Sequence, residues 1–196
     1  MTENNSGPTT TGLVHGRFQP FHNDHLKFIQ AAFEKVDFMY VGITNPDPRL
    51  TSEDSADSDR SRASSNPCTY YERQDMVISS LMESGMARER FTVVPFPINF
   101  PELWKHYAPQ DALYFLTIYD EWGERKFRLL KENGLEVDVL WRKPEAEKGI
   151  TASGVRENIA LNRPWQHLVP AGTARSIIKF GINIRIKEIF ASESGA

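Results

Sequence analysis

The sequence contains very little cysteine. Its 196 residues include one cysteine, Cys68. A single thiol excludes an internal disulfide and a zinc site built from cysteines, and it is typical of proteins from a reducing cytoplasm. Because nothing in the sequence pairs Cys68 with a base, we expect no cysteine nucleophile either.

Long apolar runs and an excess of basic charge are missing too. No segment approaches the roughly 20 apolar residues that a membrane span needs, and residues 1–11 lack the basic start and apolar centre of a secretion signal. The chain has 23 basic and 26 acidic residues, whereas a nucleic-acid-binding domain is usually strongly basic. We therefore expect a cytoplasmic protein with no membrane and no nucleic-acid partner. The sequence leaves open whether it forms a homo-oligomer.

The length of the chain suits one domain with a substantial core. We expect a disordered tail at residues 1–11 and a single domain at residues 12–196. Within that domain, residues 45–67 are rich in Ser, Asp and Pro and show no periodicity. We expect them to form a long flexible loop of the kind that closes over substrates.

Apolar segments that predict strands alternate with amphipathic segments that predict helices. Strands are expected at residues 11–16, 38–44, 90–96, 111–117 and 135–141. Helices are expected from residue 24 to about 36 and at residues 69–84, 102–107, 122–134, 153–161, 171–181 and about 184–190. This order predicts a three-layer α/β/α fold with a parallel sheet of about five strands and a helical C-terminal segment. Ligands of such folds bind at the carboxyl ends of the strands.

Two of the five histidines, His22 and His25, lie three residues apart where the first expected strand gives way to a helix. Side chains at this spacing lie on the same side of a helix. A helix N-terminus has free N–H groups and a partial positive charge, so it binds phosphate. The pair therefore predicts a phosphate-binding turn. The alternative is that both histidines are solvated or capping residues of an ordinary amphipathic helix.

The segment GRFQPFHNDH, residues 16–25, resembles the GRFQPFHxGH motif of the nucleotidyltransferase superfamily, in particular of archaeal-type nicotinamide-mononucleotide adenylyltransferases. Three later segments are similar to that family's NPxTxxER, LW and ISxTxxR segments, in the same order: residues 66–76, 102–107 and 150–158. The resemblance implies a Rossmann-like fold. It also implies transfer of a nucleoside monophosphate from a nucleoside triphosphate to an acceptor phosphate, with release of pyrophosphate.

The resemblance also implies roles for particular residues. His22 and His25 would contact the triphosphate as charge builds on the reacting oxygens, and Arg156 would hold the β and γ phosphates. The other residues expected to bind the nucleotide are Gly16, Arg17, Phe18, Thr151 and Ser153. Mg²⁺ bridging phosphate oxygens is expected, without assigned protein ligands. A structural and a functional role for Arg73 both stay open, and Arg156 has the alternative of a surface helix arginine.

Asp24 departs from the family motif, which has glycine at this position. The substitution adds a side chain and a negative charge close to the expected phosphates. Asp24 is either a helix-start residue favoured by the helix dipole or a group that helps to hold Mg²⁺. In both cases the packing of the nucleotide against this turn is changed.

Two more departures concern the acceptor. The fourth expected strand leads into TIYDEWGERK, where relatives have a short turn near the ribose, and this segment carries Arg125 and Lys126. Prolines precede Trp104, where dinucleotide-forming relatives have polar residues. We predict that Trp104, Arg125 and Lys126 bind a small anionic acceptor. The alternatives are a solvated helix face for the basic residues and a core or lid position for the tryptophan.

The wider family that the chain resembles includes CTP-dependent cytidylyltransferases of natural-product pathways, such as antibiotic biosynthesis, which attach CMP to a small phosphate or phosphonate acceptor. The departures suit that group, so the resemblance implies such an activity as the first expectation. An ATP-dependent nicotinamide-mononucleotide adenylyltransferase of NAD biosynthesis is the first alternative. The second is a nucleotide-binding regulatory module without catalysis. Both histidines and the late hydroxyl and arginine motif are present, which argues against that module.

Overall fold

A computed structural model describes residues 10–47 and 62–194. Residues 1–9 of the expected tail and residues 48–61 of the expected loop lie outside the described residues. In the part that is described, no helix is long and apolar enough to cross a membrane.

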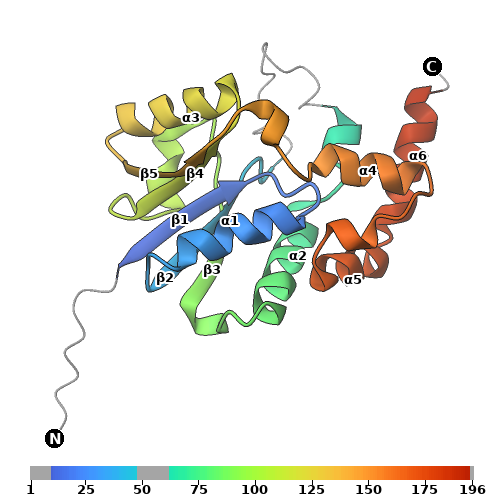
Figure 1. Cartoon of the computed structure of the whole chain (residues 1–196), viewed down its shortest axis with the longest axis horizontal. Helices are drawn as coiled ribbons and strands as arrows, with labels where there is room; N and C mark the ends of the chain where they lie inside the picture. The colour runs from blue at the N-terminus through green and yellow to red at the C-terminus, as the bar shows by residue number, and fades with distance from the viewer. Residues whose placement is uncertain (1–9, 48–61, 195–196) are drawn as a thin grey trace, which may run out of the picture.

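Five parallel strands form one sheet in the order β3-β2-β1-β4-β5 (Figure 1). The strands are β1 Thr11–Gly16, β2 Phe38–Ile43, β3 Phe91–Pro95, β4 Leu113–Ile118 and β5 Glu136–Arg142. The chain crosses from β1 outward to β3 and then returns to the other side of β1 to form β4. A crevice between β1 and β4 at the carboxyl edge of the sheet is therefore the expected ligand site.

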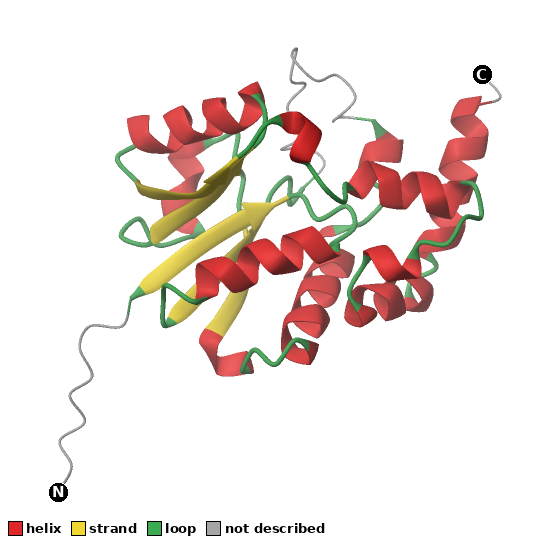
Figure 2. Ribbon diagram, viewed as in Figure 1, coloured by secondary structure: helices red, strands yellow, loops and turns green. Residues whose placement is uncertain are grey.

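Helices cover both faces of the sheet (Figure 2). The α-helices are α1 Asn23–Phe33, α2 Tyr70–Glu83, α3 Glu121–Glu132, α4 Ala152–Ala160, α5 Ala171–Lys179 and α6 Ile182–Ser194. Neighbouring strand residues point to opposite faces. Thus Val14 packs in the cluster that contains α1 and α2, whereas Leu13 packs in the cluster that contains α3. Helices α4, α5 and α6 extend the cluster on the α1 and α2 side.

The predicted fold class is confirmed, and each expected strand lies within two residues of its observed bounds. The expected short last helix is wrong in length, because α6 runs from Ile182 to Ser194. Ile182 and Ile186 are fully buried, and Phe190 packs against the same cluster. This spacing of four residues gives α6 a buried stripe along most of its length. The expected helix at residues 102–107 is a 3₁₀ helix, η5, at Pro101–His106.

Candidate active site

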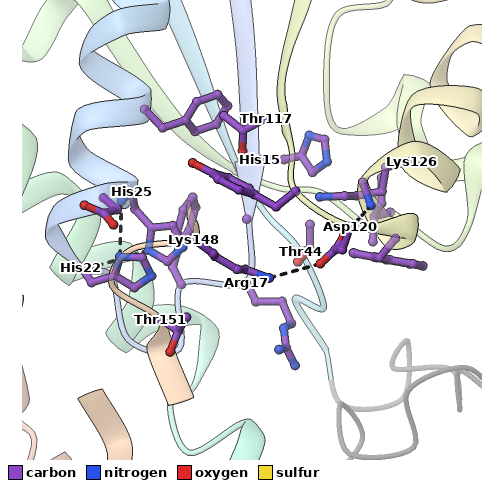
Figure 3. A pocket seen from close by; sticks show the side chains of 18 of the residues that line it. His15, Arg17, His22, His25, Thr44, Thr117, Asp120, Lys126, Lys148 and Thr151 are labelled. Atoms are coloured by element: carbon purple, nitrogen blue, oxygen red, sulfur yellow. Dashed lines mark hydrogen bonds and ion pairs between the residues drawn. The ribbon is translucent and has the colours of Figure 1, made fainter. Parts of the chain in front are cut away.

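A cavity of about 290 Å³ lies at the carboxyl edge of the sheet (Figure 3). Its walls come from the ends of β1, β2, β4 and β5 and from the first turns of α1 and α3. Most of the residues predicted to bind the nucleotide line it, namely Gly16, Arg17, Phe18, His22, His25 and Thr151. Ser153 and Arg156 do not line it. The turn after β1 and the start of α4, which are far apart in the sequence, therefore meet at one site.

His22 and His25 form a reciprocal cap on α1. The Nδ1 atom of His25 accepts the backbone N–H of His22 at 3.2 Å, and Nδ1 of His22 accepts the backbone N–H of His25 at 3.4 Å. The two rings stack with centroids 3.5 Å apart. The alternative that these histidines are capping residues is thus correct, and it coexists with their position in the cavity wall.

Both imidazoles are held in the neutral form. Burial lowers the pKa of His22 from 6.5 to about 4. Burial, followed by the charges of His22 and Arg17, holds the pKa of His25 well below its ordinary value. Because each Nδ1 accepts a backbone N–H, the remaining proton of each ring belongs on Nε2. The pair can therefore offer two neutral N–H donors to an anion without a change of protonation.

Phe18 fixes this turn by packing. Its ring is 1% exposed and meets the rings of Phe21 and His25 edge-on, with centroids 5.3 and 5.0 Å away. A Cβ atom on Gly16 would come within 2.6 Å of the Phe18 ring. Glycine is therefore required at position 16 because the Phe18 ring occupies the space next to it. Phe18 thus packs against the ring of His25, and both residues line the cavity.

Arg73 on α2 holds the backbone around the cavity. Its guanidinium donates to the carbonyl oxygens of Arg17 at 2.9 Å, Thr44 at 2.7 Å and Asn45 at 2.8 Å. The side chain is 2% exposed, and burial lowers its pKa to about 10. Of the two roles that the sequence leaves open for Arg73, these contacts support the structural one.

The start of α4 closes the other side of the cavity. Thr151 Oγ1 caps the helix by accepting the N–H of Gly154 at 3.1 Å, and it lies 3.1 Å from Ser153 Oγ. Arg156, one turn further along, is 6% exposed and donates from Nη1 to the carbonyl of Gln19 at 2.6 Å. The surface alternative for Arg156 is therefore wrong, because the side chain is buried between α4 and the turn after β1. Its predicted contact with phosphate stays a prediction.

Asp24 joins α1 to the segment before α4. Its Oδ2 accepts the backbone N–H of Ile150 at 2.7 Å, and its Oδ1 accepts from Lys27 Nζ at 3.1 Å. A Cβ atom on Gly149 would overlap Asp24 Oδ2. Asp24 and Ile150 are 126 residues apart in the sequence. The carboxylate that replaces the family's glycine thus ties together the two helix starts that border the cavity.

A comparison of the whole sequence with known protein families shows to which family the chain belongs. Residues 13–158 match the family described as "Cytidylyltransferase-like". The chain belongs to the cytidylyltransferase-like family. It is a nucleotidyltransferase, as the motifs of the sequence predicted, and the resemblance to archaeal-type adenylyltransferases is confirmed.

Individual relatives of this cytidylyltransferase-like chain span most of its length. It is 47% identical to a phosphonoformate cytidylyltransferase of Streptomyces viridochromogenes over 90% of this chain and 95% of that one. It is 32% identical to a nicotinamide-nucleotide adenylyltransferase of Thermococcus kodakarensis over 85% of this chain and 81% of that one. The phosphonate relative thus shares more identical residues and a longer aligned segment than the adenylyltransferase does.

A solved structure supports the fold of the cytidylyltransferase-like chain. It is that of a bifunctional NMN adenylyltransferase/ADP ribose pyrophosphatase of Francisella tularensis, with AMP and a manganese ion. The TM-score is 0.68 at 15% identity, over 95% of this chain. This chain spans 53% of that longer protein, so the comparison shows the shared fold alone.

The predicted acceptor residues of this cytidylyltransferase-like chain do not gather in one place. Lys126 on α3 lines the cavity. Arg125, the residue before it, does not line the cavity: its side chain is exposed, and its guanidinium lies over the Trp122 ring, 5.7 Å from the ring centre. Trp104 is 1% exposed and donates from Nε1 to the carbonyl of Pro97 at 3.0 Å. Its stacking on Phe96 places it in the core, so the core alternative for Trp104 is correct.

The sequence reasoning did not single out four residues that line the cavity: His15, Asp120, Trp141 and Lys148. Lys148 Nζ lies 3.1 Å from Asp120 Oδ2 (Figure 3). Trp141 Nε1 donates to the Tyr119 hydroxyl at 2.8 Å. His15 is 8% exposed and also faces the cavity. Their positions in the chain are a signal that could have found three of them. Asp120 lies two residues after β4, and His15 and Trp141 each lie one residue before the end of a strand.

A divalent metal in this site would depend mainly on the substrate. The described residues contain no group of three His, Cys, Asp or Glu side chains that could hold a metal ion. Both Asp24 and Asp120 line the cavity, but each already accepts hydrogen bonds from backbone N–H groups and from a lysine. This donor set fits an ion held chiefly by phosphate oxygens and water, as is common for Mg²⁺.

Proposed function

We propose that the protein transfers CMP from CTP to phosphonoformate, a small phosphonate that also carries a carboxylate, and releases pyrophosphate. The observation that carries this proposal is the 47% identity, over nearly the full length of both chains, with a phosphonoformate cytidylyltransferase. The large aromatic side chains in the cavity wall are consistent with a small acceptor. Tyr119, Trp122 and Trp141 line the cavity near the carboxyl ends of β4 and β5, and Lys126 supplies a cation for a small anionic acceptor.

In the proposed reaction, an oxygen of the phosphonate attacks the α-phosphorus of CTP. A new P–O bond forms, the bond from the α-phosphorus to the bridging oxygen breaks, and the electron pair leaves with pyrophosphate. The attacking oxygen is already anionic, so no strong base is needed, and catalysis consists of positioning and charge stabilisation.

The chain's own groups support this chemistry in a defined way. The Nε2–H groups of His22 and His25 are preorganised donors for the triphosphate, because the reciprocal cap fixes both rings. The start of α4 near Thr151 adds the partial positive charge of a helix N-terminus. Mg²⁺, when bound by the phosphate oxygens, would neutralise part of the charge on the triphosphate. The composition with one cysteine supports a cytoplasmic location for the reaction.

Transfer of AMP from ATP to nicotinamide mononucleotide is the second candidate. It is supported by the 32% identity with the nicotinamide-nucleotide adenylyltransferase of Thermococcus kodakarensis. The burial of Trp104 counts against it, since this tryptophan lies in the core and cannot stack on a nicotinamide ring.

The test is a matrix of the four nucleoside triphosphates against phosphonoformate and nicotinamide mononucleotide, with Mg²⁺, read by pyrophosphate release. We expect release with CTP and phosphonoformate. A higher rate with ATP and nicotinamide mononucleotide would replace the proposal by the second candidate, and nucleotide binding without release in any combination would contradict both.

Matched histidine variants show whether the observed activity belongs to this site. His25→Ala is expected to lower kcat/KM by about 10²-fold or more, since it removes a preorganised donor. His106→Ala is the control, because His106 is an exposed residue of η5 outside the cavity. Equal activity of the two variants would contradict the role of the histidine pair.

A further inference from the structure

His15 is a buried polar residue that the reaction described above does not use. It lies in β1 one residue before Gly16 and is 8% exposed. Its ring packs against Phe96, with centroids 5.2 Å apart. Gly42, the neighbour of His15 on β2, leaves room for these two side chains because it has none of its own. A Cβ atom at position 42 would lie 2.8 Å from Phe96 and 3.3 Å from His15.

Neither ring nitrogen of His15 has a hydrogen-bond partner among the described residues. Buried polar side chains are nearly always hydrogen-bonded, because leaving a donor or acceptor unpaired away from water costs free energy. His15 lines the cavity (Figure 3), so the missing partner can come from a bound molecule. The histidine thus has the features of a binding residue that is prepared for a ligand.

The surroundings of His15 indicate the charge of that ligand. Burial, and secondarily the charge of Lys126, lowers the pKa of His15 to about 3. The ring is therefore neutral at ordinary pH and offers one N–H donor and one acceptor. Beside it, the Lys126 ammonium contributes a positive charge to the same wall of the cavity. A neutral donor next to a cation suits an anionic oxygen.

The sheet separates this wall from the histidine pair. Side chains alternate along β1, so His15 shares the face of Leu13, which packs in the α3 cluster. His22 and His25 belong to the turn that leads into α1, on the other face. A molecule bound over the edge of the sheet between β1 and β4 can therefore contact His15 at one end and the pair of His22 and His25 at the other.

We propose that His15 and Lys126 bind the carboxylate of the acceptor, with the His15 N–H donating to a carboxylate oxygen and Lys126 neutralising its charge. The inference rests on the proposed function, in which the phosphonate end must face the α-phosphorus near His22 and His25. The carboxylate then points away from the triphosphate, toward the α3 face. His15 is in this way a specificity-determining residue for acceptors that carry a second acidic group.

The test compares His15→Leu with the wild-type protein by varying phosphonoformate and CTP separately. Loss of a hydrogen bond to a charged group predicts a rise of about 10- to 100-fold in the KM for phosphonoformate. The KM for CTP is expected to change less than about twofold, because the histidine pair and α4 stay in place. The inhibition constant of methylphosphonate, which lacks the carboxylate, is expected to be unaffected as well.

Two further variants keep the test independent of any folding defect. His15→Gln retains an amide donor and should recover part of the affinity for phosphonoformate, while Lys126→Gln should raise the same KM from a partly exposed position. His106→Leu is the matched control on the exposed surface of η5. Thermal unfolding of each variant verifies that it is folded before its kinetics are compared.

The outcomes separate the inference from the proposed function. If the wild-type protein transfers no CMP to phosphonoformate, the proposed function fails and this inference fails with it. If the wild-type protein is active and His15→Leu and Lys126→Gln leave the KM for phosphonoformate unchanged, this inference alone is overturned. An equal rise in the KM for CTP would also overturn it, since it would show a general disturbance of the site.

Discussion

Replacing Asp24 by alanine removes the contact that joins the start of α1 to the segment before α4. The lost interaction is the 2.7 Å hydrogen bond from the Ile150 N–H to Asp24 Oδ2. A hydrogen bond to a charged group contributes about 1.5–3 kcal/mol. Because the Asp24 side chain is 32% exposed and partly screened by solvent, we expect a loss at or just below the low end of this range, about 1–2 kcal/mol in the free energy of unfolding.

The second partner of Asp24 provides a control. Lys27, whose side chain is 71% exposed, pairs with Oδ1 from one helical turn away. Such an exposed pair contributes roughly 0–1 kcal/mol. Lys27→Ala should therefore leave stability and activity close to those of the parent protein. Asp24→Ala should also lower kcat/KM about tenfold, because a shift of the start of α4 relative to α1 misplaces the groups that contact the triphosphate.

Gly149 allows the contact to be tested from its other side. A Cβ atom at this position would overlap Asp24 Oδ2, so Gly149→Ala should displace the carboxylate and cost about as much as Asp24→Ala. In the Asp24→Ala background the overlap is gone, and Gly149→Ala should then cost nothing. Urea unfolding of the two single variants and the double variant measures this coupling, expected at about 1–2 kcal/mol.

Three results would refute this reasoning. Additive effects of Asp24→Ala and Gly149→Ala, within about 0.5 kcal/mol, would mean that the two positions do not act through one contact. Parental stability of Asp24→Ala would mean that the contact contributes nothing. A rise in the Mg²⁺ concentration for half-maximal activity in Asp24→Asn would favour a metal ligand instead, because asparagine keeps an oxygen that can accept the Ile150 N–H.

Three other expectations follow from buried groups. Because the pKa values of His22 and His15 are lowered to about 4 and about 3 in the folded protein, the unfolded chain takes up protons first as the pH falls below 6.5. Between pH 6.5 and pH 5 each histidine should remove about 1.6 kcal/mol of stability, and urea titrations of His15→Leu should show a correspondingly smaller loss. Arg73→Lys should destabilise the protein by about 2–4 kcal/mol in thermal or urea unfolding, since lysine cannot reach several carbonyls at once, whereas Arg163→Lys at an exposed position should have little effect. The Cys68 thiol, which is buried and whose pKa burial raises to about 12, should resist a thiol reagent in the native protein and react on unfolding.

Local signals in the sequence were sufficient for the elements and for the phosphate-binding turn. The alternation of apolar and amphipathic segments predicted all five strands and the start of α2 near residue 69, where Thr69 and Glu72 form a capping box. His22 and His25 could be found because both their spacing and their position after a buried strand are local features. A capping role was among the predicted alternatives for the same reason, whereas the reciprocal contact between the two rings was not.

Contacts between distant segments could not be predicted in the same way. The partner of Asp24 is Ile150, which only the packing of α4 against the turn after β1 brings near. Trp104 and Arg125 looked suitable for binding because of their residue types, but the 3₁₀ helix η5 places one in the core and the outer face of α3 exposes the other. The unpaired nitrogens of His15 become visible only when the side chains on both neighbouring strands are known.

The most direct test of the account is ³¹P NMR of the purified protein with CTP, phosphonoformate and Mg²⁺. The account predicts that CTP and phosphonoformate disappear together while pyrophosphate and a product with a phosphonate–phosphate linkage appear in equal amounts. It also predicts that His25→Ala greatly slows all of these changes. Spectra in which CTP and phosphonoformate both persist, while ATP and nicotinamide mononucleotide are consumed under the same conditions, would contradict it.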